Sequence, residues 1–468
     1  MPINSFLYPA PSNSNPFEVA NSLRFDDGSA DSLTQTGSGS GFTTGTLSAW
    51  VKRGKLAQSN PQSIWAYQDG TSNASRFLPH FDNGSDQFFV YAQPSSGSGT
   101  AIGLKTNREF RDLSAWYHIL VEIDTTQSTS SNRVKLYING TQETSFGTET
   151  YPDQNYVVKY MSSTSTSHVG NGGGGSNNYY FSGYMAEVCF VDGKALGPTS
   201  FGEFDSANPT IWKPKEILTQ SNPQLDFGTN GFYLQFKNSS SLGTDSSTGG
   251  NNFTVNNLTS IDQTTDTCTN NFATLNALSS RSNNGTFSEG NTKFVGTMDG
   301  DWTVGTMAAT AGKWYWEVKA NEANYLMLGI TTTDIISDNP TGSLSGDGFM
   351  GFRNTDKFYN FGTLVTSSYS FSDNDIFSFM LDLDAGDCEF YQNDTLKQTI
   401  TLPTDKGDTW IPIIGDTYDV TDGNYNINFG NPSVAISSGN TDPNGYGNFE
   451  YATKSGYAWN TKNLAEFG

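Results

Sequence analysis

The chain has 468 residues, and its 25 Lys and Arg against 47 Asp and Glu give a net charge of −22 at pH 7. Single hydrophobic cores seldom grow beyond about 250 to 300 residues, so two or three domains are expected. The acidic balance argues against nucleic acid as a partner. No apolar run approaches membrane-spanning length, and the start of the chain lacks a basic and apolar leader, so we expect synthesis in a cytoplasm and no membrane insertion.

The composition is typical of an all-β protein with many turns. Aromatic residues reach 13% while charged residues are only 15%, which is unlike a disordered chain. The 3 cysteines and 3 histidines are scattered along the sequence, which argues against a zinc site and a disulfide framework.

An N-terminal arm over residues 1–18, rich in proline, precedes a series of short alternating runs over 19–205. Turns such as Asn83-Gly84 and Asn139-Gly140 separate these runs, as expected for a β-sandwich or jelly roll. The runs are SLRFDD, TLSAWVKR, SIWAYQD, QFFVYAQ, WYHILVEID, RVKLYING and YMAEVCFVDG.

Residues 206–300 are polar and poor in strand patterns, and we interpret them as a connector that packs on the domains and donates edge strands. Strand patterns resume over 301–432 and predict a second sandwich, and the aromatic-rich tail over 433–468 is expected to dock. The connector's recurring apolar residues are Phe253, Leu258, Phe272, Leu275 and Leu278.

Two acids in the run WYHILVEID raise the question of a sugar hydrolase. Glu122 and Asp124 stand in a strand that falls short of the Glu-x-Asp-x-x-Glu pattern of laminarinase-type enzymes, because Gln127 occupies the last position. Retaining hydrolysis needs a second carboxyl about 5 to 5.5 Å from the first. An antiparallel hairpin that sets Glu122 opposite Lys135 and Asp124 opposite Arg133 explains both acids without chemistry.

A second hairpin carries four acids, Asp382, Asp384, Asp387 and Glu389. A two-residue turn at Ala385-Gly386 would set like charges opposite one another, which destabilises a sheet. Either the register differs or a cation lies there, and Ca²⁺ is the cofactor that such a cluster would hold. Acids exposed to water on a turn are the alternative, and no other cofactor is expected.

Aromatic residues beside Asn and Gly are the candidates for glycan binding. Tyr179 and Tyr180 follow the glycine-rich stretch GNGGGGSNN, which lacks the lysine and the strand-to-helix pattern of a phosphate loop. Sugar rings stack on such side chains, and sandwiches also use them to cover open edges. Trp65, Tyr67 and His80 are open to the same two interpretations.

These segments resemble known families. GTLSAWVKRG, WYHILVEID, VKLYING and SGYMAEVCFVDG resemble a laminin-G or pentraxin-type domain of the concanavalin A-like superfamily. GKWYWEVKA, LGIT, DIFSFMLDLDAGDCEFYQND and YNINFG resemble a SPRY domain, a related two-sheet sandwich. The tandem arrangement, the connector GTNGFYLQFKNSSSLGTDSS and the ending NGYGNFEYATKSGY are similar to a family of virion proteins from marine tailed bacteriophages. This resemblance covers nearly the whole chain after residue 19, with Cys268 where the family commonly has proline.

The resemblance implies an exposed, non-catalytic component at the virion surface: a tail fibre, a receptor-binding appendage or a head decoration. Its partners would be other virion proteins, further copies of the chain (a trimer is compatible) and host surface polysaccharide. The first hypothesis is a virion protein whose loops bind host glycans. The second is an architectural cement protein that binds nothing outside the particle, and the third is a glycan depolymerase, which needs paired acids that this sequence does not provide.

Overall fold

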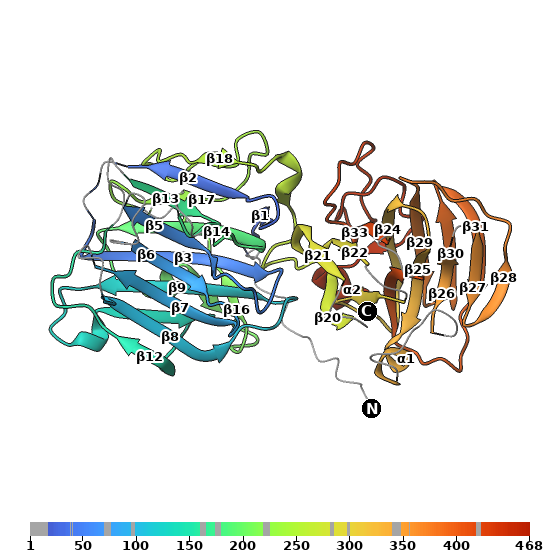
Figure 1. Cartoon of the computed structure of the whole chain (residues 1–468), viewed down its shortest axis with the longest axis horizontal. Helices are drawn as coiled ribbons and strands as arrows, with labels where there is room; N and C mark the ends of the chain where they lie inside the picture. The colour runs from blue at the N-terminus through green and yellow to red at the C-terminus, as the bar shows by residue number, and fades with distance from the viewer. Residues whose placement is uncertain are drawn as a thin grey trace, which may run out of the picture.

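The computed structural model describes residues 17–37, 39, 41–69, 76–94, 99–159, 165–173, 179–218, 225–280, 285–296, 300–338, 348–354, 356–417 and 423–468. Of the predicted N-terminal arm, residues 1–16 lie outside the described residues. Figure 1 shows two β-sandwiches side by side, the first in blue to green and the second in orange to red, with the yellow part of the connector between them. The predicted all-β fold with two sandwiches in tandem is confirmed.

The first sandwich pairs an eight-stranded sheet with a nine-stranded sheet among the described residues. Its two central strands, β3 and β14, run 10 residues each and are almost wholly buried. The eight-stranded sheet has the order β11 (Thr141–Gln142), β10 (Val134–Ile138), β9 (Trp116–Asp124), β3 (Thr44–Arg53), β14 (Gly183–Asp192), β1 (Ser22–Phe25) and β19 (Gln263–Thr264), with β17 (Phe232–Leu234) also beside β14. The nine-stranded sheet has the order β12 (Phe146–Thr150), β8 (Ile102–Glu109), β7 (Gln87–Gln93), β6 (Arg76–Phe81), β5 (Trp65–Asp69), β13 (Ser165–Val169), β2 (Ser32–Thr36) and β18 (Thr254–Asn256), with β4 (Gln62–Ser63) also beside β6.

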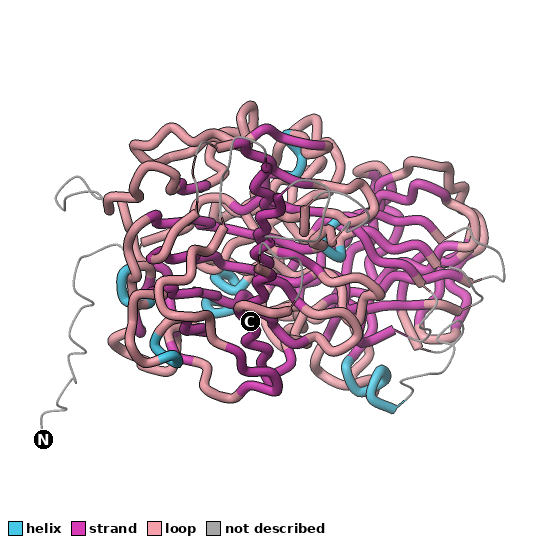
Figure 2. The backbone as a smooth tube through the Cα atoms, turned by 60° about the vertical axis from the view of Figure 1, so that its left-hand side comes forward, coloured by secondary structure: helices cyan, strands magenta, loops and turns pink. Residues whose placement is uncertain are grey.

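The second sandwich has the same two-layer plan. Its strands alternate between a shared apolar core and the outer faces, and Figure 2 shows both sandwiches as stacks of strands joined by loops. One sheet has the order β20 (Leu275–Ser280), β23 (Trp302–Gly305), β32 (Trp410–Asp416), β25 (Leu326–Thr332), β26 (Met350–Arg353), β27 (Lys357–Asn360) and β28 (Thr363–Thr366). The other has the order β21 (Thr286–Ser288), β22 (Lys293–Val295), β33 (Asn424–Asn428), β24 (Lys313–Glu322), β29 (Ile376–Asp382), β30 (Asp387–Gln392) and β31 (Thr395–Thr401), with β34 (Tyr457–Ala458) parallel to β24.

Helices are short and lie outside the two sandwiches' sheets. The turns of 3₁₀ helix are η1 (Ser130–Asn132), η2 (Pro198–Ser200), η3 (Ser260–Asp262) and η4 (Glu289–Asn291), and the α-helices are α1 (Thr333–Asp338) and α2 (Thr461–Phe467). No helix in the described part of the chain is long and apolar enough to cross a membrane.

The hairpin that carries Glu122 has the predicted register. Glu122 pairs with Lys135 and Val121 with Leu136 across β9 and β10. The turn Asn139-Gly140 that follows has φ values of 48° and 76°, which is the left-handed backbone of a type I′ turn. The expected pairing of Asp124 with the Arg133 side chain is corrected: the Arg133 guanidinium instead donates to the backbone oxygens of Gln127, Ser128 and Pro152.

The connector belongs to both sandwiches. It supplies β17, β18 and β19 to the first and β20, β21 and β22 to the second, and the small hairpin of β15 (Gly202–Phe204) and β16 (Trp212–Pro214) covers the outer face of β9. Phe253 and Leu258 are buried in the first core, whereas Phe272 and Leu275 are buried against the second sandwich. Leu278 departs from the expectation that the connector's apolar residues pack, because its side chain is 60% exposed.

The tail docks on the second sandwich and helps to fix the connector. Trp459 is fully buried in the second core, with its ring centroid 4.8 Å from that of Trp314, and its carbonyl oxygen accepts from Ala273 N at 2.8 Å. Helix α2 then begins with Asn460 as N-cap, whose side chain accepts from Asn463 N.

Buried polar contacts hold the two sandwiches together. Arg24 on β1 is 1% exposed and donates to the carbonyl oxygen of Pro432 at 3.2 Å, while its Nε lies 3.3 Å from a carboxylate oxygen of Glu289 in η4. The Tyr184 hydroxyl on β14 donates to the carbonyl oxygen of Gly290 at 3.0 Å. Because these donors belong to the first sandwich and the acceptors to the second, the relative position of the two is fixed.

Candidate functional site

Three of the five predicted glycan contacts lie in the core of the first sandwich or just under its surface. Trp65 and Tyr67 are 1% exposed, and the Trp65 ring packs 5.2 Å from the Phe190 ring, between centroids. His80 is 4% exposed, with Nδ1 2.8 Å from the carbonyl oxygen of Leu78. A sugar ring cannot reach these side chains, so the prediction is corrected for them: alternation put aromatic residues on the inner face of β5, where they fill the space between the sheets.

Tyr180 instead lines an open cavity of about 360 Å³ at one end of the first sandwich. Its phenol ring is half-buried, as is that of its neighbour Tyr179, whose carbonyl oxygen accepts from Ser63 N at 3.1 Å. Apart from Ala30, the rest of the lining is polar, and it comes from two segments that the sequence separates from Tyr180 by more than a hundred residues. These lining residues are Asp27, Ala30, Gln58, Ser59, Asn60 and Gln62.

The acidic turn beside Tyr180 is itself tightly built. Asp31 is 4% exposed and accepts from Asp26 N at 2.9 Å, and burial raises the pKa of Asp31 to about 6. Burial also raises the pKa of Asp26, with the neighbouring Asp27 adding to that rise and Lys55 opposing it. Lys55 pairs directly with Asp27 and so compensates the carboxylate that faces the cavity.

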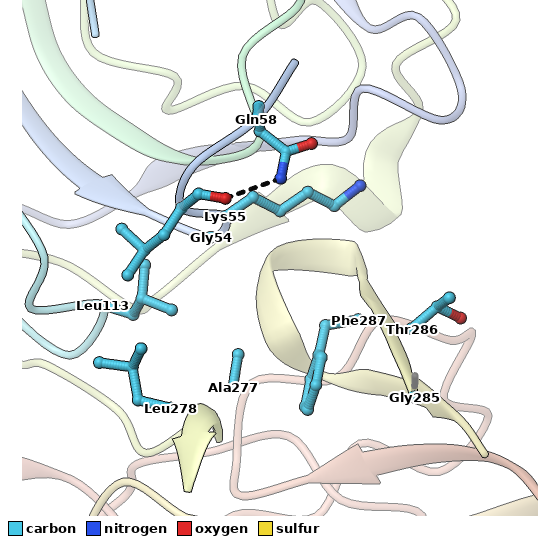
Figure 3. Close-up of a pocket in the computed structure, with 10 residues that line it drawn as sticks. Gly54, Lys55, Gln58, Leu113, Ala277, Leu278, Gly285, Thr286 and Phe287 are labelled. Atoms are coloured by element: carbon cyan, nitrogen blue, oxygen red, sulfur yellow. Dashed lines mark hydrogen bonds between the residues drawn. The ribbon is translucent and has the colours of Figure 1, made fainter. Parts of the chain in front are cut away.

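A second cavity of about 310 Å³ lies between the two sandwiches (Figure 3). One wall is the segment Gly54 to Gln58 of the first sandwich, and the other consists of Ala277, Leu278 and Phe287 on β20 and β21 of the second. Figure 3 shows Leu278, Ala277 and Phe287 on one side of the opening and Lys55 and Gln58 on the other, with Leu113 of the first sandwich beside Leu278. The Gln58 amide donates to the carbonyl oxygen of Leu56 at 2.9 Å.

The two cavities adjoin along the segment 54–62. Gln58 lines both of them, and the Lys55–Asp27 ion pair joins a lining residue of the second cavity to one of the first. We call the combined surface the junction groove. It is concave, it carries the half-buried aromatic rings of Tyr180 and Phe287 and several amides, and it is formed by residues from both sandwiches.

The four acids of the second predicted site do not converge. The turn spans four residues, so Asp382 pairs with Asp387, and Glu389 lies opposite Met380 rather than opposite Asp382. Asp382 is 2.6 Å from the Lys313 amine, Asp384 accepts from Gly312 N at 3.0 Å, and Glu389 bonds the Tyr391 hydroxyl. No group of three or more candidate ligands that could hold a metal ion occurs in the described ranges, which include all four acids.

The observed register leaves one pair of acids, Asp382 and Asp387, directly opposite one another. Asp382 faces Asp387, and the like charge contributes to a raised pKa for Asp387, after burial. The Lys313 amine beside Asp382 keeps the pKa of that carboxyl below its usual range, against the effect of burial. One lysine thus offsets the repulsion that the sequence predicted.

Glu122 and Asp124 are held by structural contacts. Glu122 accepts from the Lys135 amine at 3.2 Å and from the Tyr137 hydroxyl at 3.0 Å, and Asp124 accepts from Thr126 N at 3.1 Å. Neither residue lines a cavity of the junction groove. This agrees with the structural interpretation of the strand.

A buried Ser–His pair on the outer face of β9 resembles part of a hydrolase site but cannot act as one. His118 Nε2 lies 2.8 Å from Ser48 Oγ, and the Trp212 indole N–H donates to His118 Nδ1 at 3.0 Å. Because the indole can only donate, Nδ1 is the acceptor and Nε2 carries the proton, so the ring cannot accept a proton from Ser48. The histidine is fully buried, which lowers its pKa to about 3.

Comparison with known families agrees with this architecture. The model of the concanavalin A-like lectin/glucanases superfamily matches residues 26–199, and the model of the SPRY domain matches residues 313–415. The chain therefore carries a concanavalin A-like domain followed by a SPRY domain. Domains of these two kinds are typically non-catalytic binding domains. No curated protein matches the chain.

Solved structures similar to parts of the chain are of the same kinds. The SPRY domain of human HERC1 has 12% identity and a TM-score of 0.28, covering 33% of this chain and 96% of that one. A heptameric SAP-like pentraxin from Limulus polyphemus has 15% identity and a TM-score of 0.29, covering 38% and 79%. The TRIM65 PSpry domain has 16% identity and a TM-score of 0.27, covering 33% and 90%.

Most residues of the junction groove were not singled out from the sequence. Asp27, Gln58 and Asn60 lie in polar turns that look like any other turn of this Gly-, Ser- and Asn-rich chain. Leu278 was noted only as an apolar residue of the connector. An exposed turn with several amides near a strand end is only a weak sequence signal for a binding site. The local sequence does not show which turns come close to Tyr180 in the folded chain.

Proposed function

We propose that this chain is a non-catalytic protein of a bacteriophage particle that binds glycans through the junction groove. The observation that carries the binding proposal is the cavity beside Tyr180, where an aromatic ring stands among amides and one carboxylate. Ligand sites are typically concave surfaces with a few convergent polar groups, and this cavity has the side chains that hydroxyl-rich rings need.

The chemistry of the cavity fits sugar binding. The half-buried Tyr180 ring offers an apolar face to the C–H groups of a sugar ring. Gln58 and Asn60 each carry an amide that donates and accepts, and Asp27 accepts from hydroxyl groups. Glycan hydrolysis requires two carboxyl groups about 5 to 10 Å apart, whereas the lining residues include one, Asp27, which supports binding without catalysis.

A glycan array tests the binding proposal. The purified chain is expected to bind a subset of bacterial surface polysaccharides, and Tyr180→Ala is expected to reduce that binding at least tenfold. Tyr359→Ala is a matched control, because Tyr359 is also half-buried but lies on β27 of the second sandwich, away from the groove. Equal loss in both variants, or no binding by the unmodified chain, would contradict the proposal.

The placement on a phage particle rests on the resemblance of the connector and the tail to marine phage virion proteins. On this proposal the chain lies at the virion surface, with other virion proteins and copies of itself as partners. Cryo-electron microscopy of the particle tests it: density for the two sandwiches on a tail or fibre, with the junction groove facing outward, is the expected result. Absence of the chain from purified particles would rule the placement out.

An architectural role is the second candidate, and apolar side chains on the second sandwich favour it. Leu364 and Val365 on β28 and Leu396 on β31 are 41% to 49% exposed, and both strands are the outermost in their sheets. Exposed apolar residues on edge strands are where neighbouring subunits pair. Density in which these edges are covered by capsid subunits while the junction groove is buried would favour this role over glycan binding.

A further inference from the structure

We infer that the ligand of the junction groove is an uncharged glycan whose sugars carry ester-linked acyl groups, with a sugar ring at Tyr180 and an acyl group between the two sandwiches. This inference rests on the proposed function and deepens it. An unsubstituted sugar has no apolar group that would occupy the apolar half of the groove, whereas an acylated sugar has one.

The two halves of the groove differ in chemistry but adjoin. The cavity at Tyr180 is lined by Asp27 and by amide and hydroxyl side chains, whereas the cavity between the sandwiches is lined mainly by leucine, alanine and phenylalanine side chains. Gln58 stands in the wall of both. A ligand that occupies both cavities must therefore be polar at one end and apolar at the other.

The apolar half exposes more hydrophobic surface than folding requires. Leu278 is 60% exposed although it follows the fully buried Leu275 on the same strand. In Figure 3 its side chain lies beside Leu113 of the first sandwich, and Ala277 and Phe287 continue its own wall of the cavity. A single exposed leucine is ordinary, but several apolar side chains in one concave surface mark a binding site. The floor can bury a methyl or a short alkyl group.

The rim of the apolar half supplies hydrogen-bond donors. The Lys55 ammonium has three N–H groups and the Gln58 amide has two. Among the described residues, Lys55 pairs with Asp27 and the Gln58 amide donates to the carbonyl oxygen of Leu56. An acyl ester combines an alkyl group with a carbonyl oxygen that needs a donor. A deoxy sugar's methyl group needs none, so the donors above the apolar floor favour an acyl group.

The charge of the surroundings favours an uncharged sugar. Asp27 faces the cavity and Asp26 and Asp31 lie in the same turn, so three carboxyl groups stand near the single ammonium of Lys55. The chain as a whole carries a net charge of −22. A polyanionic polysaccharide would be repelled from this face.

The experiment uses the full chain and an array of uncharged capsular and O-chain polysaccharides. Each polysaccharide is printed twice, in its native O-acylated form and after mild alkaline de-esterification. We expect the unmodified chain to bind the acylated form about fivefold or more tightly, the effect of burying one or two methyl-sized groups. Leu278→Ser should bring the ratio close to one, and Leu364→Ser, a change at a leucine 48% exposed on β28, should leave it unchanged.

The outcomes separate the inference from the proposed function. If both forms bind equally well to the unmodified chain and Tyr180→Ala abolishes both, the glycan site stands and the acyl inference is overturned. If Leu278→Ser and Leu364→Ser lower the ratio alike, the apolar half of the groove is not where the acyl group binds. If no polysaccharide binds in either form, the proposed function fails and the inference falls with it.

Discussion

Replacing Lys52 by Met is expected to weaken the junction between the two sandwiches. The Lys52 amine on β3 lies 2.8 Å from Asp266 Oδ2, 2.7 Å from Asn271 Oδ1 and 3.0 Å from the carbonyl oxygen of Phe272. Lys52 and Asp266 are 1% and 0% exposed. The Phe272 ring continues into the apolar cluster on the outer face of the second sandwich, so this one amine ties β3 to the second sandwich.

The cost follows from the charge that the substitution leaves behind. Removing one partner of a buried ion pair typically destabilises a protein by about 3 to 5 kcal/mol, because the other charge stays buried without compensation. Asp266 keeps two donors, the Trp116 indole N–H at 3.1 Å and Phe272 N at 3.2 Å. We therefore expect a loss near the lower limit, about 3 kcal/mol.

Urea denaturation followed by tryptophan fluorescence measures this loss. Lys213→Met is the matched control, since Lys213 pairs with Glu203 and Asp205 at the surface, where ion pairs contribute about 0 to 1 kcal/mol. The double variant Lys52→Met with Asp266→Asn removes the uncompensated charge and should recover most of the stability. If Lys52→Met costs no more than Lys213→Met, or if the double variant is as unstable as the single one, the reasoning from the buried charge is refuted.

Three further predictions concern the first sandwich: the pH dependence of Glu187→Gln, the titration of His118 and the stability of two glycine variants. Burial raises the pKa of Glu187 to about 7 from 4.5, so the folded state keeps a proton that the unfolded chain releases, and native stability falls as pH rises through this interval. Glu187→Gln should raise the free energy of unfolding by about 2 to 3 kcal/mol at pH 8 and leave it unchanged at pH 4, as measured by urea denaturation at both pH values. The His118 ring, with a pKa lowered to about 3 by burial, should show no titration by NMR between about pH 5 and 8. Gly140→Ala should cost more stability than Gly84→Ala. Both glycines have a positive φ, +76° for Gly140 and +69° for Gly84, but a Cβ added at Gly140 would lie 2.3 Å from the Trp212 ring, whereas one added at Gly84 meets nothing within 4 Å. Equal melting temperatures of the two variants would contradict this reasoning.

The sequence by itself determined the sandwich architecture and much of its local detail. Alternation of apolar and polar residues follows directly from the two faces of a strand, so the strands of both sandwiches could be predicted, and so could the pairing of Glu122 with Lys135. The turn at Asn139-Gly140 was predictable because few other residue pairs adopt two consecutive left-handed conformations. These features depend on interactions between neighbours in the chain or across one hairpin.

Only the tertiary structure decided which aromatic residues are accessible. Trp65 and Tyr67 are two residues apart on β5, so alternation places both side chains on one face of the strand, but it does not tell whether that face meets water or the core. Here that face lies against the core of the sandwich, and both side chains are buried. In the same way His118 lies on the outer face of β9 and is nevertheless buried, because the distant Trp212 covers it. Whether the outer face of a sheet is buried depends on segments far away in the sequence, so the local sequence pattern cannot predict it.

The junction groove belongs to the same category. Asp27, Gln58 and Tyr180 meet because three loops of the first sandwich end at one place, and Leu278 reaches the groove because buried contacts such as that of Lys52 with Asp266 fix the second sandwich beside the first. The register of the acidic hairpin was likewise settled by a four-residue turn and not by charge. The sequence determined that these residues lie in turns and strands, and the packing of two sandwiches determined that they face one another.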